Sequence, residues 1–413
     1  MSYSCSMDMK LLFALLLLAS PMALANSPPS DPAKSPPSDP AKSPPSDPAK
    51  PSPSVPAKPS PSDPAKPSPS VPAKPSPSVP AIYIFGDSIL DAGNNHFNKN
   101  CTAQADFPPY GESFFKKPTG RFTNGRTIAD FISQFIGLPL QKPYMEMQNQ
   151  KSNGTSRFPT NGINFASAGS GLLPDTNKDM VVTPIQTQLQ QFQKLVEENK
   201  IDKSKMQESL FLVESGSTDV FNFFLPDQQT PKLSPEAYVD AMVVEMDKTI
   251  DQIYKLGARR IAVFSLGRVG CVPARALIPE APTDKCFDKM TDMAKNFNKK
   301  LEDIVNKIPT KFPGAKAVFG SVDGITHTFQ TYPSRFGFKD VSNACCGEGK
   351  LGGTMQCGKE SYNICNNSNE FLFWDFYHPT ERTYQLISKA FWDGNKNQIR
   401  PFNLKALATN KTV

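Results

Sequence analysis

Short apolar runs alternate with amphipathic stretches between about residues 81 and 392. Ile82–Phe85 and Leu210–Val213 are continuously apolar, as strands buried on both faces usually are. In contrast, Thr183–Asn199 repeats its apolar residues three and four positions apart, which predicts a helix. The expected strands are 82–85, 162–166, 210–214, 260–266 and 315–319, and we expect the strand at 315–319 to be the last. The expected helices are 127–135, 183–199, 235–256, 284–307 and 379–392. Pro379 is expected to open the final helix.

This alternation of strands and helices is typical of a parallel sheet that helices cover on both faces. We therefore expect an α/β protein, built as a three-layer α/β/α sandwich around a mostly parallel sheet. Roughly 320 residues exceed the usual size of one core, although single α/β domains of this length occur. We assign residues 81–400 to one domain and 401–413 to a C-terminal tail.

The N-terminal part of the chain has a different composition. Residues 1–25 combine Lys10, an apolar run over 11–19 and the triplet Ala23-Leu24-Ala25, the layout of a secretory signal peptide. The apolar run is too short to span a bilayer comfortably, so it is not a membrane anchor. The mature protein is expected to be secreted, with the vacuole as the alternative destination.

Residues 26–80 repeat the eight-residue unit Ser-Pro-Pro-Ser-Asp-Pro-Ala-Lys, with variations. Almost nothing in this unit is apolar, so it cannot form a core, and its prolines favour an extended polyproline II conformation. We expect a semi-rigid linker. It is either a spacer or an arm that contacts the cell wall or carries glycans.

Of the eight cysteines, Cys5 lies in the predicted signal peptide, which leaves seven. In a secreted protein six are expected to pair and one to be left over, with the connectivity open. Zinc binding by the cluster Cys345–Cys365 is the less favoured alternative, because no histidine lies within it. Four Asn-x-Ser/Thr sequences permit glycosylation, at Asn100, Asn153, Asn366 and Asn410.

The formal net charge of +6 is spread along the chain. Basic residues do not cluster with interleaved aromatic residues, which argues against nucleic-acid binding. No polybasic segment suggests a membrane surface as a partner, and no segment beyond the N-terminus approaches the length of a transmembrane helix.

Two short segments at opposite ends of the domain carry the candidate chemistry. Gly86-Asp87-Ser88 follows the first expected strand, so Ser88 lies at the carboxyl edge of the sheet, where α/β proteins have their clefts. Asp375 and His378 are close enough in sequence to occupy one turn. A serine becomes a nucleophile when a base removes its proton, and a carboxylate fixes the tautomer of that base. The three residues predict a serine hydrolase, whereas Asp87 is expected to hydrogen-bond the turn. Taken singly, each segment is common in ordinary turns.

Glycine-containing turns follow the next two expected strands as well. Gly169 lies after the second, and Gly216-Ser217-Thr218-Asp219 lies after the third. Because glycine lets the backbone approach a substrate closely, the N–H of Gly169 is a candidate oxyanion donor. A glycine turn without a ligand explains the same residues equally well.

Longer segments around these motifs resemble the plant GDSL esterase/lipase family of the SGNH hydrolases. The resemblance implies Ser88 as the nucleophile, His378 as the base and Asp375 as its orienting acid. It also implies that the oxyanion donors are the backbone of Ser88, Gly169 and the third motif, and that the partner is a small-molecule ester. No cofactor or metal is expected. The matching segments, in order, are 85–95, 118–126 with Asp130, 164–171 and 373–380.

The chain departs from the family pattern at Thr218. The third motif of the family is Gly-x-Asn-Asp, whose asparagine donates to the oxyanion, and here threonine occupies that position. Loss of one such donor costs about 2.7–4 kcal/mol in the transition state, which weakens catalysis without abolishing acylation. The leading hypothesis is ester hydrolysis through an acyl-serine. The alternatives are transfer of the acyl group to an alcohol and a catalytically silent binding protein of the same fold.

Overall fold

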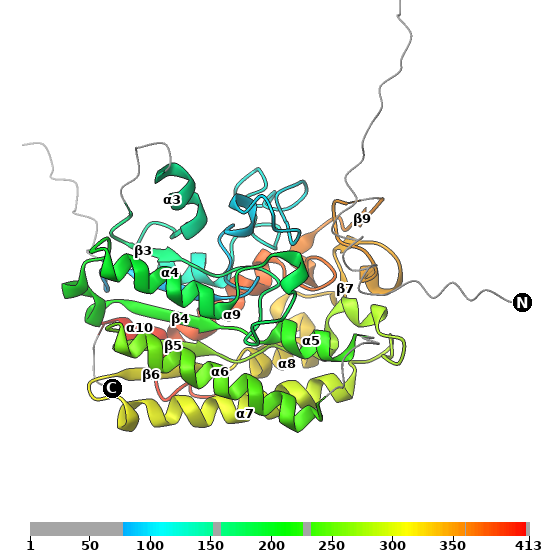
Figure 1. The fold of residues 1–413 in the computed structure, drawn as a ribbon. Coiled ribbons are helices and arrows are strands. Elements are labelled where there is room, and N and C mark those ends of the chain that lie inside the picture. The colour runs from blue at the N-terminus through cyan, green and yellow to red at the C-terminus, as the bar shows by residue number, and fades with distance from the viewer. Residues whose placement is uncertain (1–76, 152–157, 226–232, 360, 410–413) are drawn as a thin grey trace, which may run out of the picture. The chain divides into compact units, whose positions relative to one another are not determined.

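The computed structural model describes residues 77–151, 158–225, 233–359 and 361–409 (Figure 1). The predicted signal peptide, nearly all of the proline-rich linker, and the acceptors Asn153 and Asn410 lie outside the described residues.

A seven-stranded sheet forms the centre of the domain, with the strand order β11-β6-β5-β4-β1-β3-β2. The five predicted strands all form and pair in parallel, while β11 runs antiparallel to β6 at one edge. Every residue of β1, β4 and β5 is buried, which explains why these strands are apolar apart from Glu214 at the end of β4 and Arg260 at the start of β5. The strands are β1 (Ile82–Gly86), β2 (Lys142–Pro143), β3 (Gly162–Asn164), β4 (Leu210–Glu214), β5 (Arg260–Phe264), β6 (Lys316–Gly320) and β11 (Ile399–Arg400).

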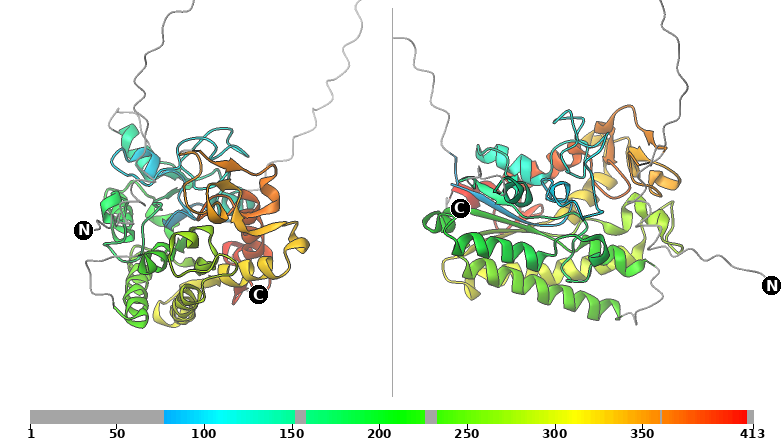
Figure 2. Two further views of the ribbon diagram at one scale, coloured as in Figure 1. Left: turned by 90° about the vertical axis from the view of Figure 1, so that its right-hand side faces the viewer. Right: turned by 45° about the horizontal axis from the view of Figure 1, so that its top comes forward.

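Helices cover both faces of this sheet (Figures 1 and 2). Helices α4, α6 and α7 pack side by side on one face, and α2, α9 and α10 pack on the other. The predicted three-layer α/β/α sandwich is therefore confirmed. The helices are α2 (Ile128–Ile136), α3 (Tyr144–Lys151), α4 (Ile185–Glu197), α5 (Ser217–Phe224), α6 (Pro235–Lys255), α7 (Asp288–Lys311), α8 (Val322–Thr331), α9 (Glu381–Asp393) and α10 (Leu404–Thr409).

The prediction that Pro379 opens the last helix is wrong. Pro379 pairs with Phe373 in an isolated β-bridge, and α9 begins after Thr380, whose hydroxyl accepts a hydrogen bond from the backbone of Thr383. A threonine at this position is a strong N-cap, because it satisfies a backbone N–H that the helix itself leaves unpaired. The bridge therefore closes the loop that carries Asp375 and His378 at its base.

Helix α9 is followed by α10, which buries Leu404, Leu407 and Ala408 in the same core. The folded domain therefore continues past residue 400, and the segment that we treated as a tail contains a packed helix.

Strand formation also continues beyond β6, contrary to the expectation that it was the last strand. Two small two-stranded sheets follow, and two disulfides, Cys345–Cys365 and Cys346–Cys357, cross-link this region. The zinc alternative for this cluster is wrong, since its four cysteines are paired with one another. The additional strands are β7 (Asp340–Ala344), β8 (Cys346–Gly347), β9 (Asn363–Ile364) and β10 (Phe371–Phe373).

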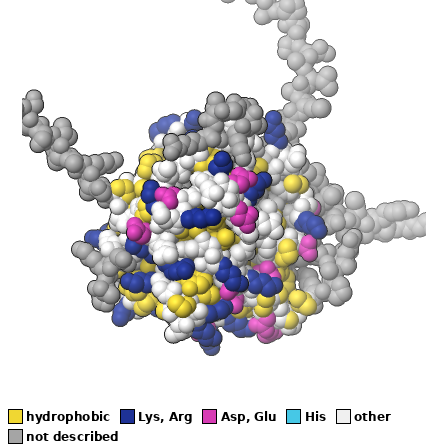
Figure 3. Space-filling model, turned by 60° about the vertical axis from the view of Figure 1, so that its left-hand side comes forward, with side chains coloured by type: hydrophobic (Ala, Val, Ile, Leu, Met, Phe, Trp, Pro, Cys, Tyr) yellow, Lys and Arg dark blue, Asp and Glu magenta, His cyan; other side chains and the backbone are white. Residues whose placement is uncertain are grey.

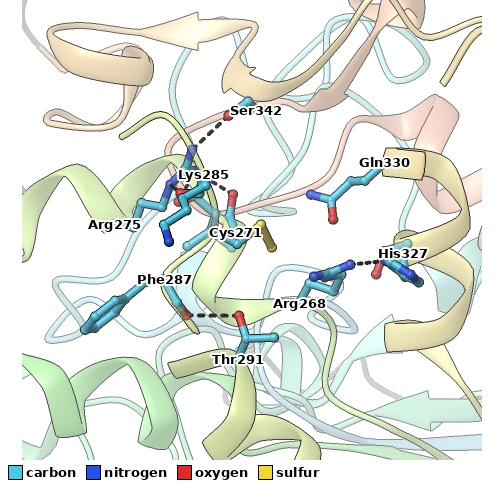
Figure 4. The surroundings of a disulfide bond; sticks show 12 residues. Arg268, Cys271, Arg275, Lys285, Phe287, Thr291, His327, Gln330 and Ser342 are labelled. Atoms are coloured by element: carbon cyan, nitrogen blue, oxygen red, sulfur yellow. Dashed lines mark hydrogen bonds between the residues drawn. A yellow bond between two sulfur atoms is a disulfide. The ribbon is translucent and has the colours of Figure 1, made fainter. Parts of the chain in front are cut away.

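A third disulfide joins Cys271 to Cys286 ahead of α7. Nearby, the buried guanidinium of Arg275 donates to the carbonyl oxygens of Cys271 and Lys285 and to the hydroxyl of Ser342 (Figure 4). These contacts tie the disulfide loop to β7. The remaining cysteine of the domain, Cys101, is free and buried, so the expectation of six paired cysteines and one left over is confirmed.

On the face shown in Figure 3, lysine and arginine side chains are interspersed with acidic and uncharged ones and form no continuous basic area. Within the described residues, no helix combines the length and apolar character needed to cross a membrane.

Candidate active site

Ser88 follows β1 directly, in a turn that only glycine permits at its start. Gly86 has φ +148°, and a Cβ added there would lie 1.9 Å from the carbonyl oxygen of Glu214 on the neighbouring strand. Asp87 stabilises the turn, because its Oδ1 accepts a hydrogen bond of 3.1 Å from the N–H of Ile89. This is the role that the sequence predicts for Asp87. The turn places the Ser88 side chain at the carboxyl edge of the sheet.

His378 joins the two distant segments. Its Nε2 lies 2.8 Å from Ser88 Oγ, and its Nδ1 lies 2.9 Å from both carboxylate oxygens of Asp375. Both distances fall within the range for proton transfer and tautomer control. Ser88 and His378 are each only 5% exposed, so the contact is largely protected from solvent. The structure therefore brings together the serine, imidazole and carboxylate that the sequence singles out.

Asp375 accepts hydrogen bonds from side chains and from the backbone. Tyr110 Oη donates to Oδ2 at 2.6 Å, and the backbone N–H groups of Tyr377 and His378 donate to Oδ1 at 2.8 and 2.7 Å. Burial alone would raise the pKa of Asp375. Attraction to His378 and the hydrogen bonds from His378 and Tyr110 outweigh burial, and the pKa lies below its usual range. Asp375 is therefore ionised at neutral pH.

Tyr110 is a functional candidate that the sequence does not reveal. It lies 265 positions from Asp375, in a loop without a recognisable motif. A tyrosine preceded by two prolines looks like an ordinary turn, so no local signal could have identified it.

Ser88 and His378 line a cavity with about 490 Å³ of empty space, and part of this space is open to solvent. Gly169 and Thr218 face the same cavity, so the three strand-end turns meet as the sequence predicts. Most of the wall is apolar. The other lining residues are Ala103, Phe122, Asn177, Met180, Phe221, Asn222, Gln356, Phe376 and Tyr377.

The candidate oxyanion donors face this cavity without competing partners. Among the described residues, no acceptor pairs with the N–H of Ser88 or Gly169, and none pairs with the hydroxyl of Thr218. Gly169 has φ +77°, a conformation that favours glycine, and its carbonyl is held at 2.9 Å by Asn177 Nδ2. A threonine hydroxyl can be captured by nearby backbone, but within the described part of the chain the Thr218 hydroxyl makes no such bond.

Buried acids connect the three turns. Asp219 accepts hydrogen bonds from the N–H groups of Leu172 and Leu173 and from Thr176, which ties the third turn to the second. Asp91 accepts one from the N–H of Ala168 at 2.9 Å, which ties the first turn to the second. These contacts fix the spacing of the candidate donors relative to Ser88.

The histidine nearest the first motif takes no part in this cluster. His96 is exposed and pairs with Asp106, with its Nδ1 3.1 Å from Oδ2, as expected for a surface loop residue.

The sequence model of GDSL-like lipases/acylhydrolases matches residues 82–391 of this chain. The chain belongs to this family. GDSL esterase/lipase 6 from Arabidopsis thaliana is 76% identical over 331 residues, which cover 80% of this chain and 91% of that protein. A GDSL lipase from Tanacetum cinerariifolium is 34% identical over 345 residues, covering 80% and 88%.

The region that matches the GDSL family contains the whole candidate site. Ser88 lies near the start of the matched region and His378 near its end, so the match includes every element that surrounds the cavity. The protein is a carboxylic ester hydrolase, and its substrates are small-molecule esters.

Proposed function

We propose that this GDSL hydrolase cleaves its ester through a covalent acyl intermediate on Ser88. The observation that carries the proposal is the unbroken chain of contacts from Ser88 Oγ through the His378 ring to the Asp375 carboxylate. Such a chain activates a serine hydroxyl, since the imidazole takes its proton as the oxygen attacks the ester carbonyl.

Acylation follows from this geometry. Ser88 Oγ attacks the carbonyl carbon while His378 Nε2 takes the hydroxyl proton, and ionised Asp375 stabilises the imidazolium that forms. His378 then gives the proton to the leaving alcohol. A water molecule, activated by the same nitrogen, releases the acid and restores Ser88.

Three groups are suited to stabilise the oxyanion: the N–H groups of Ser88 and Gly169 and the hydroxyl of Thr218. Their support is that they face the cavity beside Ser88 and lack other partners among the described residues. The apolar wall formed by Phe122, Met180 and Phe221 favours an apolar acyl group.

Labelling with a fluorophosphonate tests the nucleophile. Because the probe reacts with activated serines, we expect one equivalent on Ser88, identified by mass spectrometry of the modified peptide. Ser88→Ala protein of unchanged fold is the control and should remain unlabelled. Stoichiometric labelling of a different serine, or of none, would contradict the proposal, and the second result would favour a silent binding protein.

Substitution of Thr218 tests the weakest part of the oxyanion site. Thr218→Val removes the hydroxyl at constant shape, and we expect kcat to fall by about 10²-fold. Thr218→Asn replaces the hydroxyl with a longer amide donor, and we expect kcat to rise by about tenfold. Initial rates with a p-nitrophenyl ester measure both. If neither variant changes kcat, Thr218 is not an oxyanion donor.

Acyl transfer to an alcohol is the second candidate, and one further cavity favours it. This cavity shares Tyr377 with the cavity beside Ser88 and is also largely apolar. Two of its polar lining atoms, Arg268 Nε and Gln330 Oε1, are buried without partners among the described residues (Figure 4). A hydroxyl group can accept from the first and donate to the second. Formation of a new ester when alcohols are supplied, instead of free acid alone, identifies transfer.

We also propose that the protein is secreted, or delivered to the vacuole, through the N-terminal segment. The three disulfides support an oxidising compartment. The glycosylation acceptors Asn100 and Asn366 are exposed, so glycans can be attached at both. Contact with the cell wall through the proline-rich linker belongs to the same proposal.

A further inference from the structure

Two carboxyl groups that pair with no Lys or Arg among the described residues lie beneath the Ser88 turn. Asp87 precedes Ser88, and Glu214 ends β4, the strand next to β1. Gly86 and Glu214 are direct partners in this parallel pair, which brings the two acids together. Asp87 is 1% exposed and Glu214 is completely buried.

In each of the two carboxyl groups, only one oxygen has a hydrogen-bond partner among the described residues. Asp87 Oδ1 accepts from Ile89, and Glu214 Oε1 has one long contact of 3.5 Å from the hydroxyl of Ser217. Asp87 Oδ2 and Glu214 Oε2 are buried and make no hydrogen bond of ordinary geometry with the described residues, although the backbone N–H of Gly216 also acts on the Asp87 carboxylate and lowers its pKa. Two buried carboxylates repel each other, and neither is solvated. One proton held between them removes both penalties.

We propose that Glu214 is protonated at neutral pH and donates this proton to the Asp87 carboxylate, and that the pair fixes the Ser88 turn and directs a single negative charge toward His378. Glu214 is then a positioning residue, which acts on Ser88 and His378 through Asp87. The protonation rests on the buried pair alone, whereas its effect on turnover rests also on the proposed function.

The surroundings of the pair decide which acid keeps the proton. Burial, the charge of Asp87 and the hydrogen bond to Asp87 all raise the pKa of Glu214 well above its usual range. The pKa of Asp87 is also raised, because burial outweighs the opposing effects of the hydrogen bond from Glu214, the N–H groups of Ile89 and Gly216, and the nearby His378; these effects act on Asp87 and not on Glu214. The charges of the pair also help to raise the pKa of three neighbouring groups: Asp219 on α5, Tyr377 in the loop that carries His378, and Tyr384 on α9.

The charge on Asp87 has a consequence for catalysis. His378 becomes an imidazolium when it takes the Ser88 proton, and a second nearby carboxylate stabilises that cation in addition to Asp375. A doubly ionised pair would cost far more in desolvation, and a neutral pair would provide no charge. A single shared proton is therefore the state that serves the reaction.

The pH dependence of unfolding tests the proton directly. A folded protein that keeps Glu214 protonated gains stability below the ordinary pKa of glutamate and loses it as the pH rises toward the raised pKa. Glu214→Gln has no such proton. Above about pH 5, we expect the folding equilibrium constant of wild type relative to Glu214→Gln to fall by about tenfold per pH unit. Denaturant unfolding at several pH values measures it.

Glu302→Gln is the matched control, because Glu302, on α7, pairs with Arg400 of β11 and, among the described residues, has no hydrogen bond or ion pair with Asp87 or Glu214. Its stability should stay parallel to that of wild type over the same pH range. Parallel curves for wild type and Glu214→Gln would overturn the proposal. If Glu214→Gln does not fold, wild type labelled with ¹³C at the glutamate carboxyl carbons gives the answer. One signal must retain the protonated shift at pH 7, and its absence would equally overturn the proposal.

Turnover tests the second half of the proposal. Asp87→Asn removes the charge near His378 but keeps a hydrogen-bonding group, so we expect kcat to fall about tenfold and KM to change little. The acidic limb of the pH–rate profile should move to lower pH, which a purely structural defect would not cause. Glu214→Ala should lose at least as much activity, and Glu214→Gln should recover most of it. An Asp87→Asn profile that matches wild type would refute the electrostatic role, even where the labelling of Ser88 succeeds.

Discussion

Ser88→Ala is expected to lower kcat for ester hydrolysis by about 10⁶-fold, the size of the loss when a serine hydrolase loses its nucleophile. Without the hydroxyl, His378 has no proton to take and no acyl intermediate can form. The binding cavity and the N–H donors remain, so a residual rate above the uncatalysed reaction should persist. Initial rates with a short p-nitrophenyl ester measure the loss.

Ser204→Ala is the matched control for this change. Ser204 is exposed and lies in a short 3₁₀ helix (Lys203–Glu208) remote from the cavity, so its removal should leave kcat unchanged. The thermal transition of Ser88→Ala should match that of wild type, because within the described residues the Ser88 hydroxyl makes one hydrogen bond, to His378. Equal rates for Ser88→Ala and wild type would disprove acyl-serine catalysis.

The long buried strands were predictable because each of them contains a run of apolar residues. Residues 210–213 and 260–264 face helices on both sides of the sheet, so nearly every position must be apolar. In contrast, β2 and β11 contain two residues each, too few to show any periodicity. Their existence depends on pairing with β3 and β6, which is a tertiary contact.

The site was predictable to the extent that its residues lie within motifs. Ser88 and His378 could be identified because each occurs in a short motif together with neighbouring residues that indicate its role. Tyr110 and Glu214 do not, since their roles arise from partners that the fold supplies. Glu214 meets Asp87 only because β4, third among the predicted strands, is placed next to β1. Chain order alone does not reveal that adjacency.

Asp375→Asn is expected to lower kcat by about 10⁴-fold while leaving the fold intact. Among the described residues, four donors surround this carboxylate: Tyr110, two backbone N–H groups and His378 Nδ1. An asparagine has one oxygen instead of two, and its amide N–H₂ would face at least one donor. His378 would then be held in the wrong tautomer or turned away from Ser88. Asp393→Asn, at an exposed position of α9, is the control and should retain full activity.

The same substitution should alter stability at acidic pH. The pKa of Asp375 is lowered in the folded protein, so this group stabilises the fold above the ordinary pKa of aspartate and loses its contribution as the pH falls through the lowered value. Asp375→Asn has no proton to bind there. Below about pH 4, its free energy of unfolding should therefore decline less steeply than that of wild type, as measured by denaturant unfolding. A wild-type slope in Asp375→Asn, together with unchanged kcat, would mean that the carboxylate neither orients His378 nor contributes its charge to the fold.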